Sequence, residues 1–472
     1  MRSRDCKIVA TLGPASDPAE RMMMVIEAGV DCFRLNFSHG SKDEHARRVA
    51  TIREAETRIG RPIAIIADLQ GPKLRVGDFV NGGVTLRYND IVTLEASSEL
   101  GDDTVIRLPH PEIVETLEVG DILKLDDGKL QLTITAIKGK QREARVDFGG
   151  VLKNRKGVNV PSRRIPISAL TEQDKHHLAF ALEHGVDYVA LSFVQSAGDV
   201  LEARALIGDR AGIISKIEKP AALDDLGEIT RLSDAVMVAR GDLGVELPPE
   251  QVPIAQRRII RVARIFGKPV IVATHMLESM IDAPTPTRAE ASDVATAVYQ
   301  GADAVMLSAE SAVGRHPASA VAIMDRIIKA VESDPDHWAN LARDAARPEQ
   351  TTGDAIAQAA RNIAEVIDAA KVVAYTATGS TALRLSRERP RRGIIAMSPR
   401  IETARQLCLA WGVTSVVTED AHDTDDMVGK AEACVRRLGA AGPGDRIVIT
   451  AGVPFGRPGK TNMIRIVRLE GG

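Results

Sequence analysis

Runs of β-branched residues alternate with helix-like runs along most of the chain, and this alternation constrains the fold more than any other feature of the sequence. Strand-like KIVATL, CFRLNFS and IAIIADL come first, and DYVALSF, GIISKIE, AVMVARGD, PVIVATHM and AVMLSAE follow from residue 187 onward. Helical patterns separate these runs, as in parallel βαβ units. Three strands before an interruption and five after it make eight, which predicts an α/β fold with a closed (β/α)8 (TIM) barrel.

The interruption, residues 70–163, has a different pattern. VTLRYNDIVTLEA and DILKLDDGKLQLTITAI alternate apolar and polar residues, and Asp127-Gly128 is a hairpin-turn signal between two such runs. This pattern predicts a small inserted β-barrel that acts as a lid. After about residue 333 a polar stretch precedes a second α/β pattern, KVVAYTA, GIIAMS, SVVTE and DRIVITAG. We therefore expect three domains: a barrel at 1–69 and 164–340, a β lid at 70–163, and a C-terminal α/β domain at 341–472.

Composition excludes some classes of partner. The net charge of −3 and the aromatic content of 3% argue against nucleic acid, because neither a basic surface nor stacking platforms are indicated. No apolar run approaches the length of a membrane span, so we expect no membrane partner. The cysteines are scattered without the spacing of a zinc site or a disulfide frame; they are Cys6, Cys32, Cys408 and Cys434. Reduced thiols of this kind favour a cytoplasmic location.

Polar side chains gather where the predicted barrel strands end. Because residues i and i+2 of a strand point the same way, Lys216 and Glu218 share one face, and Asp242 ends the next strand. Two carboxylates on adjacent strands beside a lysine form a hard-cation site with a positive charge for a phosphate or an enolate. A similar polar face runs from Arg34 to Ser38. The alternatives are a structural Lys–Glu pair in the barrel mouth and a simple salt bridge for Arg34.

Two further segments indicate phosphate binding. Arg75 follows Gly71-Pro72, where the chain leaves the barrel, and is therefore a candidate to swing with the lid onto nucleotide phosphates. In the C-terminal segment, YTATGSTA joins a strand to a helix, as in a phosphate cradle at a helix N-terminus. The cradle residues are Thr376, Thr378, Gly379, Ser380 and Thr381. A hydroxyl-rich helix cap explains the same residues equally well.

Nine motifs, in one order, resemble the pyruvate kinase family across nearly the whole chain. They are KIVATLGPAS, FRLNFSHG, DLQGPKLR, KGVNVP, ISKIE, VARGDLGVE, ATHMLESM, PTRAE and AVMLSAESA. The resemblance implies a catalytic barrel, an inserted lid and a regulatory C-terminal domain in a homotetramer. It also implies the last step of glycolysis, phosphoryl transfer from phosphoenolpyruvate to ADP, giving pyruvate and ATP. Mg²⁺ is the implied cofactor, with Mn²⁺ as an expected substitute, and a phosphorylated metabolite is the implied allosteric effector.

The resemblance also implies roles for single residues. Glu218 and Asp242 match the magnesium ligands, and Lys216 matches the residue that neutralises the phosphoryl group as it leaves. The implied catalytic residues are Lys216, Thr274 and Arg34, and the implied substrate-binding residues are Arg34, Lys216, Gly241, Asp242 and Thr274. The implied nucleotide-binding residues are Asn36, His39, Arg75 and Lys156. The effector is expected at the loop of residues 376–381, with Arg457 or Lys460 as a further contact.

The chain departs from the family pattern at several positions. Lys219, His275 and Ala309 stand where the family often has Asn, Gln and Gly, and the effector loop lacks a basic residue that many members carry. Many members place K⁺ near the residues that match Asn36, Ser38, Asp68 and Leu69. Those members have the motif GPE, whereas this chain has GPK at residues 71–73, with Lys73 in place of the Glu. We therefore expect the ammonium group of Lys73 to replace K⁺. Leu69, Gln70 and Val76 match the potassium-independent branch, and a solvated lid lysine is the alternative.

Two other functions fit part of this pattern. Lyases or aldolases that stabilise a pyruvate enolate also place Lys, Glu and Asp with magnesium on barrel strand ends, but they lack the inserted β segment. A catalytically dead sensor that binds sugar phosphates through the C-terminal domain would have lost Lys216 or a magnesium carboxylate. Both are present.

Overall fold

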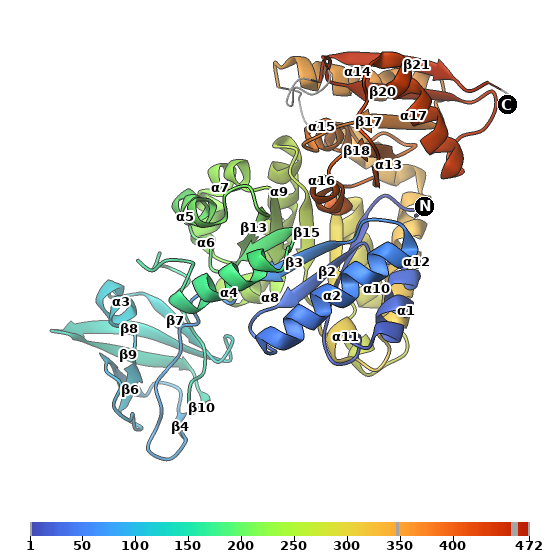
Figure 1. The fold of residues 1–472 in the computed structure, drawn as a ribbon. Helices are drawn as coiled ribbons and strands as arrows, with labels where there is room; N and C mark the ends of the chain where they lie inside the picture. The colour runs from blue at the N-terminus through green and yellow to red at the C-terminus, as the bar shows by residue number, and fades with distance from the viewer. Residues whose placement is uncertain (1, 346–348, 455–460, 471–472) are drawn as a thin grey trace.

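The computed structural model describes residues 2–345, 349–454 and 461–470. Eight parallel strands close into a barrel with neighbours in the order β1-β16-β15-β14-β13-β12-β3-β2 (Figure 1). Their bounds are β1 Lys7–Thr11, β2 Cys32–Asn36, β3 Ala64–Asp68, β12 Tyr188–Leu191, β13 Gly212–Ile217, β14 Ala235–Ala239, β15 Val270–Ala273 and β16 Ala304–Leu307. Each strand lies within its predicted run, so the predicted (β/α)8 barrel is confirmed.

Helices follow the strands and cover the outside of the barrel. Several of them begin with a capping box, in which a hydroxyl and a carboxylate satisfy the first free N–H groups. Examples are Ser41 with Glu44, the predicted Thr171 with Asp174, and Thr287 with Glu290. The helices are α1 Ala19–Ala28, α2 Lys42–Ile59, α4 Glu172–Glu183, α5 Ala197–Ile207, α6 Pro220–Asp224, α7 Leu226–Leu232, α8 Arg240–Glu246, α9 Val252–Ile265, α10 Arg288–Tyr299, α11 Ala309–Ala312, α12 Pro317–Glu332 and α13 Pro335–Arg343.

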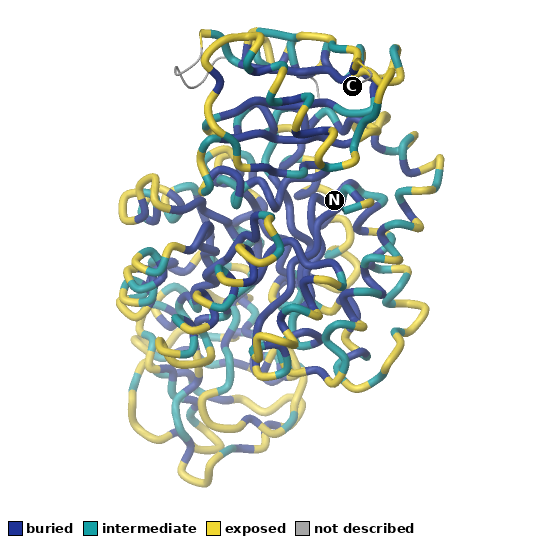
Figure 2. The backbone as a smooth tube through the Cα atoms, turned by 45° about the vertical axis from the view of Figure 1, so that its right-hand side comes forward, coloured by how far each residue is buried: buried dark blue, intermediate teal, exposed yellow. Residues whose placement is uncertain are grey.

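The barrel strands are largely buried (Figure 2). Their two faces contribute to two separate apolar cores. Ile8 and Ala10 of β1 belong to the large core beneath the helices, whereas Val9 belongs to a smaller core inside the barrel. This period of two fixes which residues face the barrel interior. Cys408 and Leu409 of the C-terminal segment also join the interior core. The C-terminal segment therefore closes the barrel at the amino ends of its strands, opposite the carboxyl ends.

The insert after β3 forms a six-stranded sheet, in the order β11-β7-β8-β9-β5-β6, and a two-stranded sheet of β10 and β4. One apolar core holds both sheets together. The predicted turn at Asp127-Gly128 joins β7 to β8, and Asp127 and Gly128 have φ values of 57° and 84°. The elements are β4 Gly83–Leu86, β5 Ile91–Ala96, β6 Val105–Leu108, α3 Pro111–Thr116, β7 Ile122–Leu125, β8 Leu130–Lys138, β9 Gln141–Phe148, β10 Gly150–Lys153 and β11 Val158–Asn159.

The C-terminal segment is an α/β unit with a five-stranded sheet in the order β19-β18-β17-β20-β21. It lies at the opposite end of the barrel from the insert (Figure 1). Ion pairs between Arg405 and Glu56, at 2.6 Å, and between Arg389 and Asp303, at 2.9 Å, attach it to the barrel. Its elements are α14 Thr352–Val366, β17 Lys371–Tyr375, α15 Ser380–Glu388, β18 Ile394–Ser398, α16 Ile401–Gln406, a 3-10 turn at Leu407–Leu409, β19 Val413–Val417, α17 Thr424–Arg437, β20 Arg446–Ala451 and β21 Met463–Arg468.

Three details differ from the sequence-based expectation. The strand expected to end at Asp242 stops at Ala239, and Asp242 lies in the first turn of α8. The polar stretch after residue 333 contains α13, which begins at an N-cap formed by Asp334. The edge strand β21, with the sequence MIRIVR, is not predicted from the sequence. Its antiparallel pairing with β20 identifies it as a strand. Within the described residues, no helix combines the length and the apolar character needed to cross a bilayer.

Candidate active site

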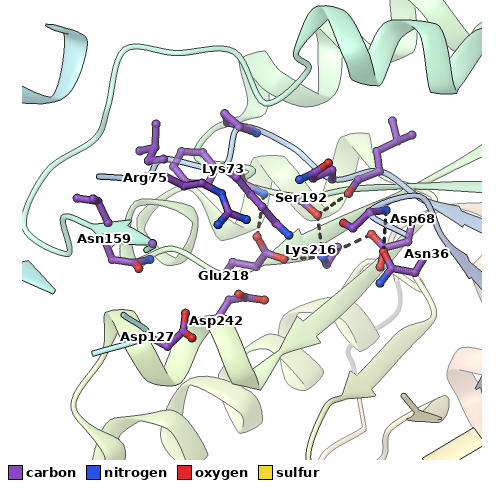
Figure 3. A pocket seen from close by; sticks show the side chains of 18 of the residues that line it. Asn36, Asp68, Lys73, Arg75, Asp127, Asn159, Ser192, Lys216, Glu218 and Asp242 are labelled. Carbon is purple, nitrogen blue, oxygen red and sulfur yellow. Dashed lines mark hydrogen bonds and ion pairs between the residues drawn. The ribbon is translucent and has the colours of Figure 1, made fainter. Parts of the chain in front are cut away.

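A polar cavity of about 460 Å³ lies between the ends of the barrel strands and the insert. Figure 3 shows Asn36 and Asp68 toward one end of this cavity, Asn159 and Asp127 toward the other, and Lys216 and Glu218 between them. Most of the residues singled out from the sequence come together here. The predicted site residues that line it are Arg34, Asn36, Ser38, Asp68, Leu69, Lys73, Arg75, Lys156, Lys216, Glu218 and Asp242.

The period of two along the strands explains why these side chains meet. Ile66 and Ile214 point into the barrel, so Asp68 and Lys216, two residues further on, point the same way at the ends of their strands. Ser192 follows β12 in the same phase as Ala190. The uppermost layer of the barrel interior is therefore polar, while the layers beneath it are apolar.

The ammonium group of Lys216 is the centre of this layer. Its Nζ lies 2.7 Å from Oε1 of Glu218 and 3.4 Å from Oδ1 of Asp68, and it donates to Oγ of Ser192 at 2.7 Å. Burial by itself would lower the pKa of Lys216, but the surrounding carboxylates outweigh burial and raise it well above the ordinary lysine value. Lys216 therefore carries a fixed positive charge at the floor of the cavity.

Arg34 and Asp68 form a second buried ion pair beside it. Nε of Arg34 lies 2.6 Å from Oδ2 of Asp68, and Nη1 of Arg34 donates to Oγ1 of Thr11 at 3.1 Å. Burial raises the pKa of Asp68, but Lys216 and Arg34 outweigh that effect and hold it below the ordinary value. Asp68 is thus ionised and positions two cations at the same end of the cavity.

Glu218 and Asp242 give the cavity two carboxylates. Burial raises the pKa of Glu218, Lys216 lowers it, and the nearby carboxylate of Asp242 raises it further, with a net upward shift. Apart from its ion pair with Lys216, Oε1 of Glu218 accepts no hydrogen bond from the described part of the chain. A divalent cation fits such a pair, because it would offset the repulsion between the carboxylates and give that oxygen a partner.

The donor set also bears on which cation fits. The described residues contain no group of three or more His, Cys, Asp or Glu side chains placed to hold a metal ion. Two carboxylates alone suit Mg²⁺, which commonly binds through one or two carboxylates and completes its shell with substrate oxygens and water.

Thr274 and Gly241 lie beside the cavity but not among the residues that line it. The Gly241 N–H donates to Oγ1 of Thr274 at 2.8 Å, and this hydroxyl donates to the carbonyl of Ala273 at 2.6 Å. Thr274 has φ of 69°, a left-handed conformation that is unusual for a β-branched residue. Arg240, which donates to the Thr274 carbonyl and pairs with Asp293 at 2.7 Å, holds this conformation. Backbone strain of this kind is concentrated at functional sites.

The predicted nucleotide-binding residues come from two sides of the cavity. Arg75 and Lys156 line it from the two linkers of the insert, which pair through a bridge between Arg75 and Gly157. Lys156 is held 2.8 Å from Asp126. Asn36 lines the barrel side, and its Oδ1 accepts from the N–H of Ser38 at 3.1 Å. His39, in contrast, is exposed and does not line this cavity.

Lys73 extends from the first linker into the cavity toward Lys216 and Glu218 (Figure 3). Burial and the charges of Arg75 and Lys216 lower the pKa of Lys73, against the opposing influence of Asp242. The structure therefore places this cation in the same cavity as Asn36, Ser38, Asp68 and Leu69.

The predicted effector loop lies far from this cavity, between β17 and α15. Gly379 has φ of 85°, and its N–H donates to Oγ1 of Thr376 at 2.9 Å. Thr378, Gly379 and Ser380 line a second cavity, of about 300 Å³, between the C-terminal segment and the barrel. Thr381 faces Thr461, with 2.7 Å between the hydroxyl oxygens. The suggested contacts from Arg457 and Lys460 fall outside the described residues.

Sequence reasoning missed several residues of the site. The sequence pattern places Ser192 only within a strand, although a polar side chain at a strand end is the signal that identifies the other positions. Asp126, Asp127, Phe193 and Asn159 also line the cavity. Asn159 lies within KGVNVP, but nothing in its sequence pattern shows that it approaches the barrel.

A (β/α)8 barrel whose strand ends present a buried lysine, paired carboxylates and a cationic linker belongs to the class of barrel enzymes that act on phosphorylated or enolate substrates. Family models agree with this class. Residues 3–321 match the barrel domain of pyruvate kinase, and residues 354–467 match its alpha/beta domain.

Curated relatives and a solved structure extend the match to nearly the whole chain. The chain is 51% identical over 465 residues to a pyruvate kinase of Methylorubrum extorquens, covering 98% of this chain and 97% of that one. It is 41% identical over 469 residues to a pyruvate kinase of Geobacillus stearothermophilus, covering 98% and 80%. The crystal structure of a pyruvate kinase from Cryptosporidium parvum superimposes with a TM-score of 0.94 at 33% identity, covering 98% and 96%.

The chain therefore belongs to the pyruvate kinase family, as the motifs indicated. Its activity is that of a glycolytic phosphotransferase whose substrates are phosphoenolpyruvate and ADP and whose product is pyruvate.

Proposed function

We propose that this cavity transfers the phosphoryl group in a magnesium-dependent reaction in which Lys216 supplies the central electrostatic stabilisation. The observation that carries the proposal is the buried Lys216 ammonium group, held between Glu218, Asp68 and Ser192 at the floor of the cavity. A fixed charge that needs no rearrangement is the arrangement that best stabilises charge developing in a transition state.

Glu218 and Asp242 are the proposed magnesium ligands. When bound there, Mg²⁺ would act as a Lewis acid and neutralise charge on substrate oxygens, and Mn²⁺ is an expected substitute. Lys216 neutralises the phosphoryl group as it leaves the enolate oxygen, and Arg34 holds the phosphate of phosphoenolpyruvate. Thr274 lies near the enolate carbon, and the Gly241 N–H is available to the substrate carboxylate once it leaves the Thr274 hydroxyl.

Arg75 and Lys156 are the proposed contacts with the ADP phosphates, with Asn36 and His39 on the barrel side. The two cations lie on the linkers of the insert, so closure of the insert would bring them onto the nucleotide and exclude water. The phosphoryl group then moves from phosphoenolpyruvate, on the barrel side of the cavity, to ADP, on the lid side.

We also propose that Lys73 replaces a monovalent cation. Its ammonium group extends into the cavity that contains Asn36, Ser38, Asp68 and Leu69. A second cation within about 4 Å would be repelled by roughly 1 to 4 kcal/mol, depending on the effective dielectric constant.

Regulation and assembly complete the proposal. The proposed division is a barrel at 1–69 and 164–340, a lid at 70–163 and a regulatory domain at 341–472. A phosphorylated metabolite is the proposed ligand of residues 376–381. A homotetramer is proposed from the family. A cytoplasmic location is proposed because the four cysteines are free and buried.

One assay tests the reaction directly. Pyruvate and ATP formation should require phosphoenolpyruvate, ADP and Mg²⁺ together, and chelation of the metal should abolish both products. Pyruvate release without ADP would instead indicate a lyase or phosphatase-like reaction. Equal turnover after exhaustive chelation would exclude the magnesium-dependent mechanism.

A further inference from the structure

One contact between the insert and the barrel is made at a short helix, α8. Lys124 of β7 and Asn159 of β11 are directly opposite one another in the antiparallel sheet of the insert. Nζ of Lys124 donates to the carbonyl of Val245 at 2.6 Å, and Nδ2 of Asn159 donates to Oε1 of Glu246 at 2.6 Å. Both members of one cross-strand pair therefore reach the last turn of the same helix.

The carboxylate that receives Asn159 is itself held by a buried cation. Glu246 is 3% exposed and Lys219 is 4% exposed, and the Lys219 ammonium group forms an ion pair with the same Oε1 of Glu246. Lys219 also lies 4.3 Å from the ring centroid of Phe193, which packs against the apolar core of the insert. The other oxygen of Glu246 has no hydrogen-bond partner among the described residues. A buried carboxylate of this kind depends on its counter-charge, so Lys219 and Glu246 act as a unit.

This contact is linked to both ends of the cavity. α8 has seven residues, with Asp242 in its first turn and Glu246 at its end. On the insert, Asn159 follows Lys156 by three residues in the returning linker. That linker is hydrogen-bonded to the outgoing one, since the Val76 N–H donates to the Lys156 carbonyl at 2.9 Å. Fixing Asn159 on α8 therefore fixes Lys156 relative to Asp242.

We propose that Glu246, with its counter-ion Lys219, is a positioning residue that docks the lid on α8 through Asn159 and so sets the nucleotide contacts for phosphoryl transfer. The inference rests on the proposed nucleotide role of Lys156 and Arg75. Neither Glu246 nor Lys219 touches the reacting atoms; their effect is on the position of the lid.

The test measures the position of the lid and the kinetics in the same variants. Asn159→Asp keeps the shape of the side chain but turns its donor into a carboxylate that faces Glu246. Asn154→Asp is the matched control, since its Oδ1 already accepts from the Phe79 N–H, which a carboxylate also does. Asn159→Asp with Glu246→Gln restores one donor and one carboxylate and should rescue the contact. Lys124→Met tests the other half of the cross-strand pair.

The distance between two spin labels at exposed positions reports the position of the lid relative to the barrel. One label is attached at Lys140→Cys on the β8–β9 turn, and the other at Glu183→Cys at the end of α4. The native cysteines are buried, so labelling is selective. Asn159→Asp and Lys124→Met should broaden and shift the label-to-label distance distribution, whereas Asn154→Asp and the double exchange should retain it. An unchanged distribution in both Asn159→Asp and Lys124→Met would overturn the docking role.

Kinetics separate this inference from the nucleotide assignment. Asn159→Asp should raise KM for ADP by about tenfold, as expected for loss of a hydrogen bond to a charged acceptor, and should change KM for phosphoenolpyruvate much less. The double exchange should recover most of that loss. A shifted lid with an unchanged KM for ADP would support the docking contact and overturn the nucleotide role of Lys156 and Arg75. Equal increases in both KM values would contradict a specific effect on the nucleotide.

Discussion

Replacing Lys216 by Met should remove the charge at the centre of the site while keeping most of the side-chain volume. At about 4 Å and an effective dielectric constant of about 20, one unit charge contributes roughly 4 kcal/mol to the stabilisation of another. Loss of one preorganised group aimed at developing charge typically costs about 10² to 10³ in kcat, or ~2.7 to 4 kcal/mol. The two estimates agree, so we expect kcat to fall by about 10² to 10³-fold or more, with phosphoenolpyruvate still bound.

The assay is pyruvate release coupled to a reporter enzyme at saturating Mg²⁺ and ADP. Lys175→Met is the matched control, because Lys175 lies on the surface and, in the described part of the chain, forms its ion pair with Glu172 on the same helix. That control should retain wild-type turnover. Near-normal turnover of Lys216→Met would refute the assigned role.

The same substitution has a predicted effect on stability and pH. The Lys216 side chain is 11% exposed, and its loss leaves Glu218 without its ion-pair partner and Asp68 paired with Arg34 alone. Breaking a buried ion pair in this way typically costs about 3 to 5 kcal/mol. Loss of Lys216 raises the pKa of Glu218 further. A carboxyl with a raised folded-state pKa stabilises the fold below its unfolded value, about 4.3, and loses that stability as pH rises. The difference in Tm between the wild type and Lys216→Met should therefore shrink from pH 7 to pH 5; a constant difference would contradict the electrostatic explanation.

Three further substitutions test the other assignments. Asp242→Ala should raise the Mg²⁺ concentration for half-maximal activity by about tenfold or more, since one oxygen ligand is lost, and an unchanged magnesium titration would place the metal elsewhere. The wild type in tetramethylammonium salts at constant ionic strength should gain little activity from K⁺, whereas Lys73→Glu should create a potassium dependence at reduced activity; strong activation of the wild type by K⁺ would refute the role of Lys73. Ser380→Asp places a negative charge in the effector loop and should abolish activation by phosphorylated metabolites, so intact activation by sugar phosphates and nucleoside monophosphates would rule out that site.

The sequence by itself determined the barrel and much of the site, because the relevant signals are local. The strand-helix alternation counts the eight strands, and the period of two places Lys216 with Glu218 and Arg34 with Asn36 on common faces. The motifs then identified the family. Turn and cap signals such as Asp127-Gly128 and Thr171 with Asp174 were equally local and equally correct.

Only the tertiary structure decided which polar residues meet across large separations in the chain. Ser192 contacts Lys216, and Asp68 binds both Arg34 and Lys216, because closure of the barrel brings the carboxyl ends of its strands together. This includes β3 and β13, which β12 separates in the sheet. The contact of Asn159 with Glu246 joins residues 87 positions apart and depends on how the insert folds back on α8. The sequence gives no period or motif for such contacts, because they are fixed by the register of the sheets and the packing of whole segments.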